Sequence, residues 1–303
     1  MKLAAIDIGT NTVLLLIARC AGAVEGILDL STITRLGEGL SGTGVLSETA
    51  MERTLAALAR YRQVAGESGV DEIVCLGTAA LREAGNSGRF LRLAEERFGL
   101  SVRVISAQEE AFYTYLSVRD LAPPAEEDLL VIDIGGGSTE IIRGTRTGFI
   151  DFVSLPIGSV KLTEMFIHHD PPETGEIAAL EAFLDKTPAL PFEGRGCPVI
   201  GTAGTMTNLA SIVLGLESFD ARRIEGHRIG AGELDVLVRR LTAMTVAEKK
   251  AVTGMEGGRA DVFLQGIILL RALLKRLGAG EITVSTKGVR YGVLYERAGL
   301  APP

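Results

Sequence analysis

One arrangement occurs twice in the 303 residues: an apolar run containing Asp, a Gly-rich corner, and then small hydroxyl or amide side chains. The copies are AAIDIGTNTVL, residues 4–14, and VIDIGGGSTEI, residues 131–141. The apolar flanks of each copy predict two strands joined by a tight turn. One copy alone would be an ordinary hairpin, because Asp and Gly are common in turns for conformational reasons. Two copies in matching contexts favour two versions of one unit, with the two turns at the mouth of a cleft between domains.

Both corners have the composition of a phosphate-binding loop. Gly lets the backbone approach a ligand closely, so that successive N–H groups can point at one anion. Asp7 and Asp133, each near the end of a strand, are placed to hold a hydrated Mg²⁺ or to position a water. Phosphoryl chemistry is therefore suggested, whereas GGGST lacks the glycine spacing of a dinucleotide site. Further hydrogen-bond donors are Thr10, Asn11, Thr12, Ser138 and Thr139.

Strand and helix patterns alternate along the chain, which predicts an α/β layer architecture. The polar, Pro-containing stretch LAPPAEED, residues 121–128, is the best candidate for a domain boundary. We expect domains at 1–122 and 123–303, and the closing helix, 289–303, is a candidate to pack back on the first domain. A long apolar helix from Val262 to Leu277, stopped by Gly278, gives the second half its own core.

Charge and composition exclude several classes of protein. The net charge is 31 minus 38, or −7, so the surface as a whole does not attract nucleic acid. No apolar run is long enough to predict a membrane span. Asp7 and Asn11 interrupt a segment that otherwise imitates a signal peptide, which argues against secretion. The three cysteines form neither a metal spacing nor a disulfide framework, so we expect buried thiols in a cytoplasmic protein.

Two further segments are candidates for chemistry. VIGTAGTMTN, residues 199–208, follows an apolar run and precedes a helix, and such a junction presents N–H groups to an anion. In SAQEEAFYTYL, Ser106 and Glu109 have the spacing of a capping box. Glu110 lies about 100° further round the helix and could accept a proton from an attacking water. The alternative for Glu110 is a solvated charge that is favourable at a helix N-terminus.

Ten segments, in order and spacing, resemble the exopolyphosphatase / guanosine pentaphosphate phosphohydrolase (Ppx/GppA) family in its short two-domain form. The resemblance implies two ribonuclease-H-like domains of the actin, hexokinase and Hsp70 superfamily around a central cleft. The segments are AAIDIGTNTVLLLIA, TRLGEGL, GTAALREA, VISAQEEA, VIDIGGGSTEI, LPIGSVKLTE, GTAGT, EGHRI, GGRADVFLQG and VSTKGVRYGVLYE.

The resemblance also implies roles for individual residues. Glu110 takes the role of general base, and Arg82 resembles the residue that orients the substrate. Glu140 and Asp133 resemble acidic residues that hold Mg²⁺ or help to position the nucleophilic water. Asp7, at the matching position of the first copy, is a further candidate metal ligand. The phosphate-loop positions are Gly9, Thr10, Asn11, Gly135, Gly136, Gly137 and Ser138, with Gly204 and Thr205 in the third loop.

The expected reaction is attack of water on the terminal phosphorus of inorganic polyphosphate, which releases orthophosphate. Hydrolysis of pppGpp to ppGpp would use the same machinery. Two alternatives of other classes remain: a non-catalytic (p)ppGpp-binding regulator, and a sugar or acid kinase that needs ATP and a second substrate. A homodimer is expected, with no nucleic-acid partner and no membrane.

The chain departs from the family pattern in two ways. Phe112 stands where Arg commonly follows the glutamate pair, and the chain ends after the second domain, without a C-terminal HD-like extension. The second departure makes processive handling of very long chains less expected and short polyphosphates relatively more plausible as substrates. Basic residues that could line the substrate path, each more often a surface or ion-paired group, are Arg35, Lys161, Arg222, Arg228, Arg259, Lys287 and Arg290.

Overall fold

The chain forms two units in a computed structural model that describes residues 1–122, 128–187, 190–192 and 196–300. The first unit comprises Met1–Ser117 and Lys287–Pro303, and the second comprises Val118–Thr286. The division therefore falls at Ser117/Val118, next to the 3-10 helix η1 (Arg119–Leu121). The expected boundary at 122/123 adjoins residues 123–127, which lie outside the described part of the chain.

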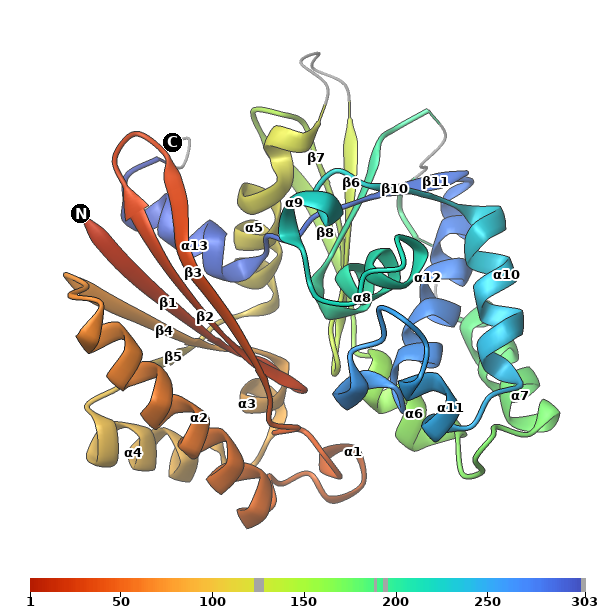
Figure 1. Ribbon diagram of the computed structural model, residues 1–303, viewed down its shortest axis with the longest axis horizontal. Helices are drawn as coiled ribbons and strands as arrows, with labels where there is room; N and C mark the ends of the chain where they lie inside the picture. Colours follow the sequence, from red (N-terminus) through yellow and green to blue (C-terminus); the bar gives the residue numbers. More distant parts are fainter. Residues whose placement is uncertain (123–127, 188–189, 193–195, 301–303) are drawn as a thin grey trace. The chain divides into compact units, whose positions relative to one another are not determined.

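A five-stranded mixed sheet forms the centre of the first unit (Figure 1). The strand β1 pairs antiparallel with β2, and β2 with β3, whereas β1, β4 and β5 are parallel. The carboxyl ends of the three parallel strands therefore share one edge, where ligands bind in open α/β sheets. In order across the sheet the strands are β3 (Val24–Ile33), β2 (Thr12–Cys20), β1 (Lys2–Ile8), β4 (Glu72–Gly77) and β5 (Val102–Val104).

Helices cover both faces of this sheet. Figure 1 shows α2 and α4 on one face and α13 on the other, where α13 packs on β1, β2 and β3. The helix α2 begins after Ser47, whose side chain accepts a hydrogen bond from the N–H of Ala50. The helices are α1 (Leu40–Thr43), α2 (Glu48–Glu67), α3 (Ala79–Glu83), α4 (Ser87–Phe98), α5 (Ala107–Val118, whose last residue lies in the second unit) and α13 (Val289–Arg297).

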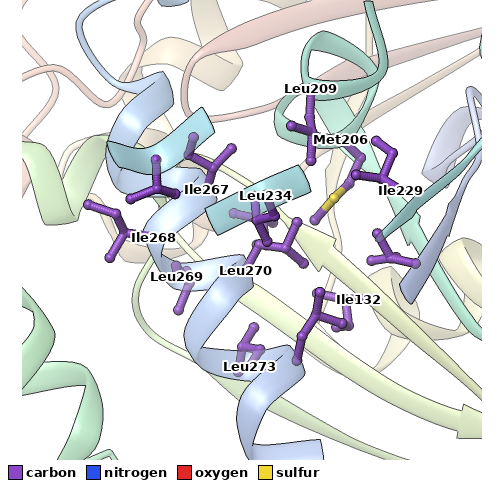
Figure 2. Close-up of a cluster of buried hydrophobic side chains, with 14 of the residues drawn as sticks. Ile132, Met206, Leu209, Ile229, Leu234, Ile267, Ile268, Leu269, Leu270 and Leu273 are labelled. Atoms are coloured by element: carbon purple, nitrogen blue, oxygen red, sulfur yellow. The ribbon is translucent and has the colours of Figure 1, made fainter. Parts of the chain in front are cut away.

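The second unit is built on a six-stranded sheet with its own apolar core. Figure 2 shows Ile132 and Met206 of this core beside residues of α12. That helix ends where Gly278 adopts a left-handed conformation, as predicted. In order across the sheet the strands are β10 (Arg228–Gly230), β11 (Glu281–Val284), β9 (Val199–Thr202), β6 (Leu129–Ile134), β7 (Thr139–Gly144) and β8 (Phe149–Leu155).

The helices of the second unit include α12, which packs against α6, α7, α8 and α10. Over the described residues, no helix is both long enough and apolar enough to cross a membrane. The helices are α6 (Ser159–Phe166), α7 (Thr174–Asp185), α8 (Ala203–Val213), α9 (Ala221–Ile224), α10 (Ala231–Thr242), α11 (Val246–Lys250), η2 (Gly257–Arg259) and α12 (Phe263–Leu277).

The expected duplication is confirmed. The order β3-β2-β1-β4-β5 of the first sheet recurs as β8-β7-β6-β9-β11 in the second, with the same antiparallel and parallel pairings among the first four strands. Each Gly-rich corner closes with the same hydrogen bond: the N–H of Gly9 donates to Thr12 O, and that of Gly135 to Ser138 O, both at 3.0 Å. The free cysteines Cys20 and Cys75 are buried as predicted, whereas Cys197 is partly exposed.

Gly292 permits α13 to approach α5 closely. A Cβ at this position would lie 1.9 Å from the carbonyl oxygen of Tyr113, which is far inside van der Waals contact with a backbone atom that cannot rotate away. The hydroxyl of Tyr113 also bridges the two helices, because it donates to Glu296 and accepts from Arg103, each at 2.8 Å. The packing of α5, which carries Glu110, thus depends on a residue without a side chain.

Gly292→Ala is expected to lower the free energy of unfolding by ~1–3 kcal/mol, because the extra methyl group overpacks this crossing. Gly232→Ala is the matched control: Gly232 is also helical, in α10, and a Cβ there meets nothing within 4 Å. The control should be neutral or stabilising by up to ~1 kcal/mol, because Ala has the higher helix propensity. Urea unfolding of the two variants measures both effects, and equal stability would contradict the close crossing.

Candidate active site

The first Gly-rich corner, loop 1 (residues 9–12), is held in place by hydrogen bonds that its carbonyl groups accept. The N–H groups of Thr34 and Arg35 donate to Asn11 O at 3.0 and 2.9 Å, and the N–H of Gly37 donates to Thr10 O at 2.9 Å. A Cβ on Gly37 would lie 2.3 Å from the Cγ2 of Thr10, so a larger residue there would push the loop away. The segment after β3 therefore fixes the shape of loop 1.

The second corner, loop 2 (residues 135–138), is held in the same way by the start of α6. The N–H of Ser159 donates to Gly135 O at 3.0 Å. The N–H groups of Val160 and Lys161 donate to Gly136 O at 3.0 and 3.2 Å. These supporting segments lie within TRLGEGL and LPIGSVKLTE, but nothing in their composition alone indicated that their N–H groups would bind the loops.

Anchored carbonyls determine where the loop amides point. A trans peptide unit is planar, and its C=O and N–H groups point in opposite directions. When the carbonyls of Gly135 and Gly136 turn toward α6, the N–H groups of Gly136 and Gly137 must turn away from it. In loop 1, the side-chain Nδ2 of Asn11 is buried and has no hydrogen-bond partner within the described residues. Both loops thus offer donors suited to the oxygens of a phosphate.

Glu110 lies at the same edge of the first unit as loop 1. The N–H of Thr78, just after β4, donates to Ile8 O, and the N–H of Ile105, just after β5, donates to Gly77 O. The loop, α3 and the start of α5 therefore follow the carboxyl ends of adjacent parallel strands.

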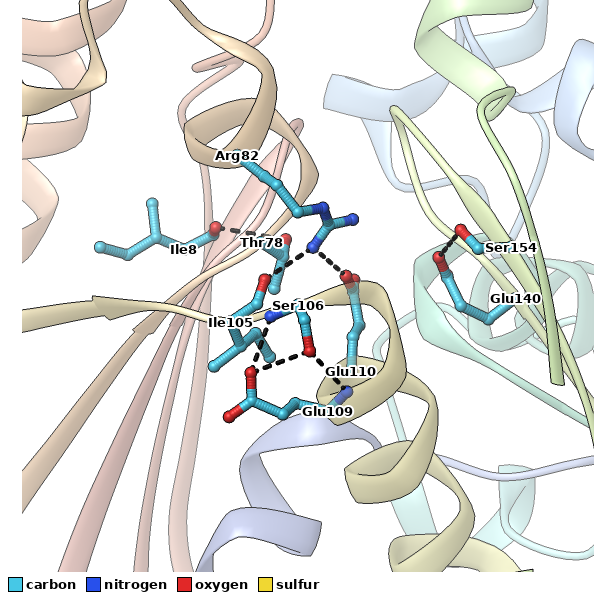
Figure 3. Close-up of polar contacts among 9 residues, drawn as sticks. All are labelled: Ile8, Thr78, Arg82, Ile105, Ser106, Glu109, Glu110, Glu140 and Ser154. Atoms are coloured by element: carbon cyan, nitrogen blue, oxygen red, sulfur yellow. Dashed lines mark hydrogen bonds and ion pairs between the residues drawn. The ribbon is translucent and has the colours of Figure 1, made fainter. Parts of the chain in front are cut away.

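The Glu110 carboxylate is buried and paired with Arg82. Nη1 of Arg82 donates to Glu110 Oε2 and to Ile105 O, both at 2.9 Å, as Figure 3 shows. Glu110 is only 8% exposed, so the interpretation of this residue as a solvated charge is wrong. The guanidinium fixes the carboxylate while one carboxylate oxygen, Oε1, takes no part in this pair.

The neighbouring Glu109 has a structural task, as predicted. Its Oε2 accepts hydrogen bonds from the N–H and Oγ of Ser106 at 2.8 and 2.9 Å, and its own N–H donates to Ser106 Oγ at 3.2 Å. The Ser106 backbone bond, with smaller contributions from the Ser106 hydroxyl and Arg103, holds the pKa of Glu109 below its usual value. The capping box therefore sets the first turn of α5, which carries Glu110.

Two carboxylates lie side by side in the sheet of the second unit. Asp133 on β6 is the register partner of Glu140 on β7, and Glu140 is the partner of Ser154 on β8. Register partners project from the same face of a sheet. Ser154 Oγ donates to Glu140 Oε1 at 2.9 Å (Figure 3), and Glu140 and Asp133 are 1% and 8% exposed. Sequence reasoning missed Ser154, because nothing in the sequence revealed its register.

The two halves differ at this row. In the first unit, Asp7 has Leu14 as its partner on β2 and Leu76 as its partner on β4. The duplicated turn therefore carries paired carboxylates only in the second unit. Adjacent buried carboxylates supply the hard oxygen donors that Mg²⁺ prefers. Among the described residues no group of three or more His, Cys, Asp or Glu side chains could hold a metal ion by itself.

The third corner forms the first turn of α8. Thr205 Oγ1 donates to Ile134 O at 3.3 Å, and the guanidinium of Arg259 lies against Gly204, where a Cβ would be 2.3 Å from its Cζ. Thr139, expected as a ligand donor, is fully buried and donates to Ile157 O at 2.8 Å. That expectation is wrong: the Thr139 hydroxyl ties β7 to the segment before α6.

Several of the candidate basic residues have partners within their own unit. Arg290 pairs with Asp29 at 2.7 Å, Arg228 pairs with Glu281 at 3.2 Å, and Arg259 pairs with Glu256. Lys161 donates its Nζ hydrogen to Pro156 O at 3.2 Å. Arg35 has a left-handed backbone, with φ of 53°, at the point where its N–H holds loop 1.

Comparison with known proteins decides the family. The model of the Ppx/GppA phosphatase family matches residues 16–300. The chain belongs to this family. Exopolyphosphatase 2 of Mycobacterium tuberculosis is 32% identical to this Ppx/GppA protein over 98% of the chain and 99% of the relative. The match supports a phosphatase activity.

Solved structures support the fold as well as the family. The crystal structure of the Ppx/GppA family member from Aquifex aeolicus has a TM-score of 0.80 at 32% identity, over 98% of this chain and 97% of that one. An exopolyphosphatase from Cytophaga hutchinsonii has a TM-score of 0.90 at 29% identity, over 99% and 98%. The predicted class, two mixed α/β domains of the actin-like fold, is therefore confirmed.

Ser154→Ala is expected to lower phosphatase turnover about tenfold. Loss of the hydrogen bond to the buried Glu140 carboxylate costs ~1–3 kcal/mol. Each ~1.4 kcal/mol of this cost that reaches the activation free energy lowers the rate tenfold. Ser31→Ala is the matched control, since Ser31 also lies in a strand but is exposed. Phosphate release measures the effect, with circular dichroism to confirm folding. Equal turnover in both variants would show that the Ser154 hydroxyl does not help to hold Glu140 for the reaction.

Proposed function

We propose that this protein is an exopolyphosphatase. It hydrolyses the terminal phosphoanhydride bond of inorganic polyphosphate and releases orthophosphate. The observation that carries the proposal is the buried Glu110, fixed by Arg82 at the edge of the sheet that also carries loop 1. The similarity to exopolyphosphatase 2 over nearly the whole chain supports the same activity.

The reaction requires few groups. A water oxygen attacks the terminal phosphorus, Glu110 accepts the proton of that water, and the bond to the bridging oxygen breaks so that the shortened polyphosphate departs. Arg82 holds Glu110 in place and lies at the same edge of the sheet, where its charge favours an anionic substrate. Loop 1 presents amides that can donate to phosphoryl oxygens, whose charge grows during the reaction, and loop 2 presents donors of the same kind in its own unit.

The carboxylate pair of the second unit fits a divalent cation. Asp133 and Glu140 are opposed in register and largely buried, and two such carboxylates repel each other unless a cation or a proton intervenes. We propose that these two residues hold Mg²⁺. Asp7 occupies the equivalent position in the first unit and is a candidate cation ligand there. When bound, the ion would neutralise negative charge on phosphate oxygens.

Hydrolysis of pppGpp to ppGpp is the second candidate, because the family that the sequence resembles includes guanosine pentaphosphate phosphohydrolases and the chain matches the Ppx/GppA phosphatase family. A non-catalytic (p)ppGpp-binding protein is less well supported, because binding alone does not require a buried carboxylate held in one orientation, as Glu110 is by Arg82. The homodimer and the cytoplasmic location expected from the sequence stay predictions.

Glu110→Gln is expected to reduce kcat ~10²–10⁴-fold, which is the usual contribution of a general base, with KM little changed. Glu109→Gln is the matched control: it alters the adjacent glutamate, and Gln serves at this position of a capping box. Steady-state phosphate release from polyphosphate measures both variants. Turnover of the Glu110 variant close to that of the control would remove Glu110 from the mechanism.

Substrate and cation are tested together. Phosphate release should be seen with polyphosphates of defined length, be lost on chelation with EDTA, and return with Mg²⁺. Asp133→Asn should raise the Mg²⁺ concentration needed for half-maximal activity at least tenfold, since it removes one charged ligand. Release from pppGpp but not from polyphosphate would favour the second candidate, and binding of ppGpp without any release would favour the regulator.

A further inference from the structure

The start of α6 is capped in an uncommon way. The first N–H groups of a helix have no partner inside the helix and usually bind a side chain at the N-cap. The N-cap of α6 is Gly158, which has no side chain to offer. The N–H groups of Ser159, Val160 and Lys161 donate instead to the carbonyls of Gly135 and Gly136. The cap of this helix is therefore loop 2 itself.

We infer that the first-turn amides of α6 position the phosphate-binding amides of loop 2, which makes Ser159 a positioning residue for the hydrolysis. The inference deepens the proposed function and rests on it. The C=O of Gly135 and the N–H of Gly136 belong to one peptide unit, and so do the C=O of Gly136 and the N–H of Gly137. A hydrogen bond to each carbonyl both orients that unit and polarises its N–H group.

The helix adds an electrostatic contribution to this orientation. The N-terminus of a helix carries a partial positive charge, which favours a nearby anion. Here the N-terminal end of α6 binds the carbonyl groups of loop 2. The N–H groups of the same loop peptides point away from α6, so the loop amides and the helix dipole both favour an anion on the side of loop 2 that faces away from the helix. Within the described residues, loop 1 is held by Thr34, Arg35 and Gly37, none of which lies in a helix.

The approach of α6 to loop 2 requires two glycines. A Cβ on Gly158 would lie 2.5 Å from Gly135 O and 2.6 Å from Gly136 O, which are backbone atoms that cannot yield. On the other side, a Cβ on Gly266 of α12 would lie 2.8 Å from the Cγ2 of Thr205 and 3.3 Å from the Cβ of Ser159. The helix α12 thus packs closely on Ser159, at the start of α6.

Ser159→Pro removes one of these amides with little change to the helix. Ser159 is the first residue of α6, a position where proline is well tolerated. Gly158 is extended, with φ of −154° and ψ of −179°, which suits a residue before proline. Proline therefore deletes the N–H that binds Gly135 O at 3.0 Å. Both Ser159→Pro and Ser159→Ala remove the hydroxyl, a longer donor to the same oxygen at 3.4 Å, so the difference between the two variants isolates the N–H.

Thr174→Pro supplies the matched control for proline itself. Thr174 is the exposed first residue of α7, and its N-cap, Glu173, is likewise extended with ψ of 152°. The control places the same ring at the same helical position in the same unit, away from loop 2. Thermal unfolding of the two proline variants shows whether their folds are comparably intact.

Ser159→Pro is expected to lower kcat about tenfold or more, with a smaller change in KM, because the loop amides act most strongly on the developing charge. Inhibition by orthovanadate, which adopts the geometry of the transferred phosphoryl group, should weaken by a similar factor. Thr174→Pro should stay within about twofold of the wild type, and Ser159→Ala, which keeps the N–H that binds Gly135 O, should lose much less activity than Ser159→Pro. If Ser159→Pro matches Ser159→Ala in kcat and in vanadate inhibition, the inference is overturned.

A measurement on the wild-type protein decides the question if Ser159→Pro does not fold. In amide NMR spectra, inorganic phosphate should shift the resonances of Gly136 and Gly137, while the amides of Ser159 and Val160 remain protected from hydrogen exchange. Unshifted glycines, or unprotected α6 amides, would overturn the inference. If the wild type releases phosphate from no substrate, the proposed function fails, but vanadate binding to the Ser159 variants still tests the role of α6.

Discussion

Both Gly-rich corners depend on one constraint, which is that their carbonyl groups are bound by N–H groups of the segment after the third strand of each half. A tight turn of glycine and small residues has little side-chain packing to fix its shape, and its glycines have more conformational freedom to lose than other residues. The bonds from Gly37 in one half and Ser159 in the other remove that freedom. Loop amides that face outward are a consequence of carbonyls that are satisfied within the protein.

The duplication supplies a common scaffold, and the chemistry comes from where the two copies differ. At the position of Glu140 in the second half, the first half has Leu14. The pair of carboxylates therefore arises in one sheet only. The other acidic group, Glu110, arises outside the duplicated turn, at the first turn of α5. The duplicated scaffold therefore carries two separate acidic groups. The Asp133–Glu140 pair lies in the second sheet, and Glu110 lies at the start of α5.

The sequence was informative wherever short-range rules apply. The repeated corner, the capping box of Ser106 and Glu109, and the stop of α12 at Gly278 all follow from local residue preferences, and all are present. Contacts between distant segments could not be predicted in this way. The Arg82–Glu110 bond spans 28 positions, and Gly158 lies against Gly135 although β7 and β8 separate them in the sequence. Ser138 and Thr139 carry similar hydroxyls, and the sequence did not show that the Thr139 hydroxyl would donate to Ile157 O, 18 positions away.

The Arg82–Glu110 pair is not explained by stability. Removing two charges from water costs several kcal/mol per ion, and well-packed apolar residues of similar volume are often as stable or more so. The side chains of Arg82 and Glu110 are 25% and 10% exposed, so the cost is substantial although incomplete. Loops at the carboxyl ends of parallel strands tolerate such a cost because the rigid sheet beneath them supplies the stability. A costly charge that is held in one orientation at the same sheet edge as loop 1 is the arrangement that the proposed proton transfer from water would require.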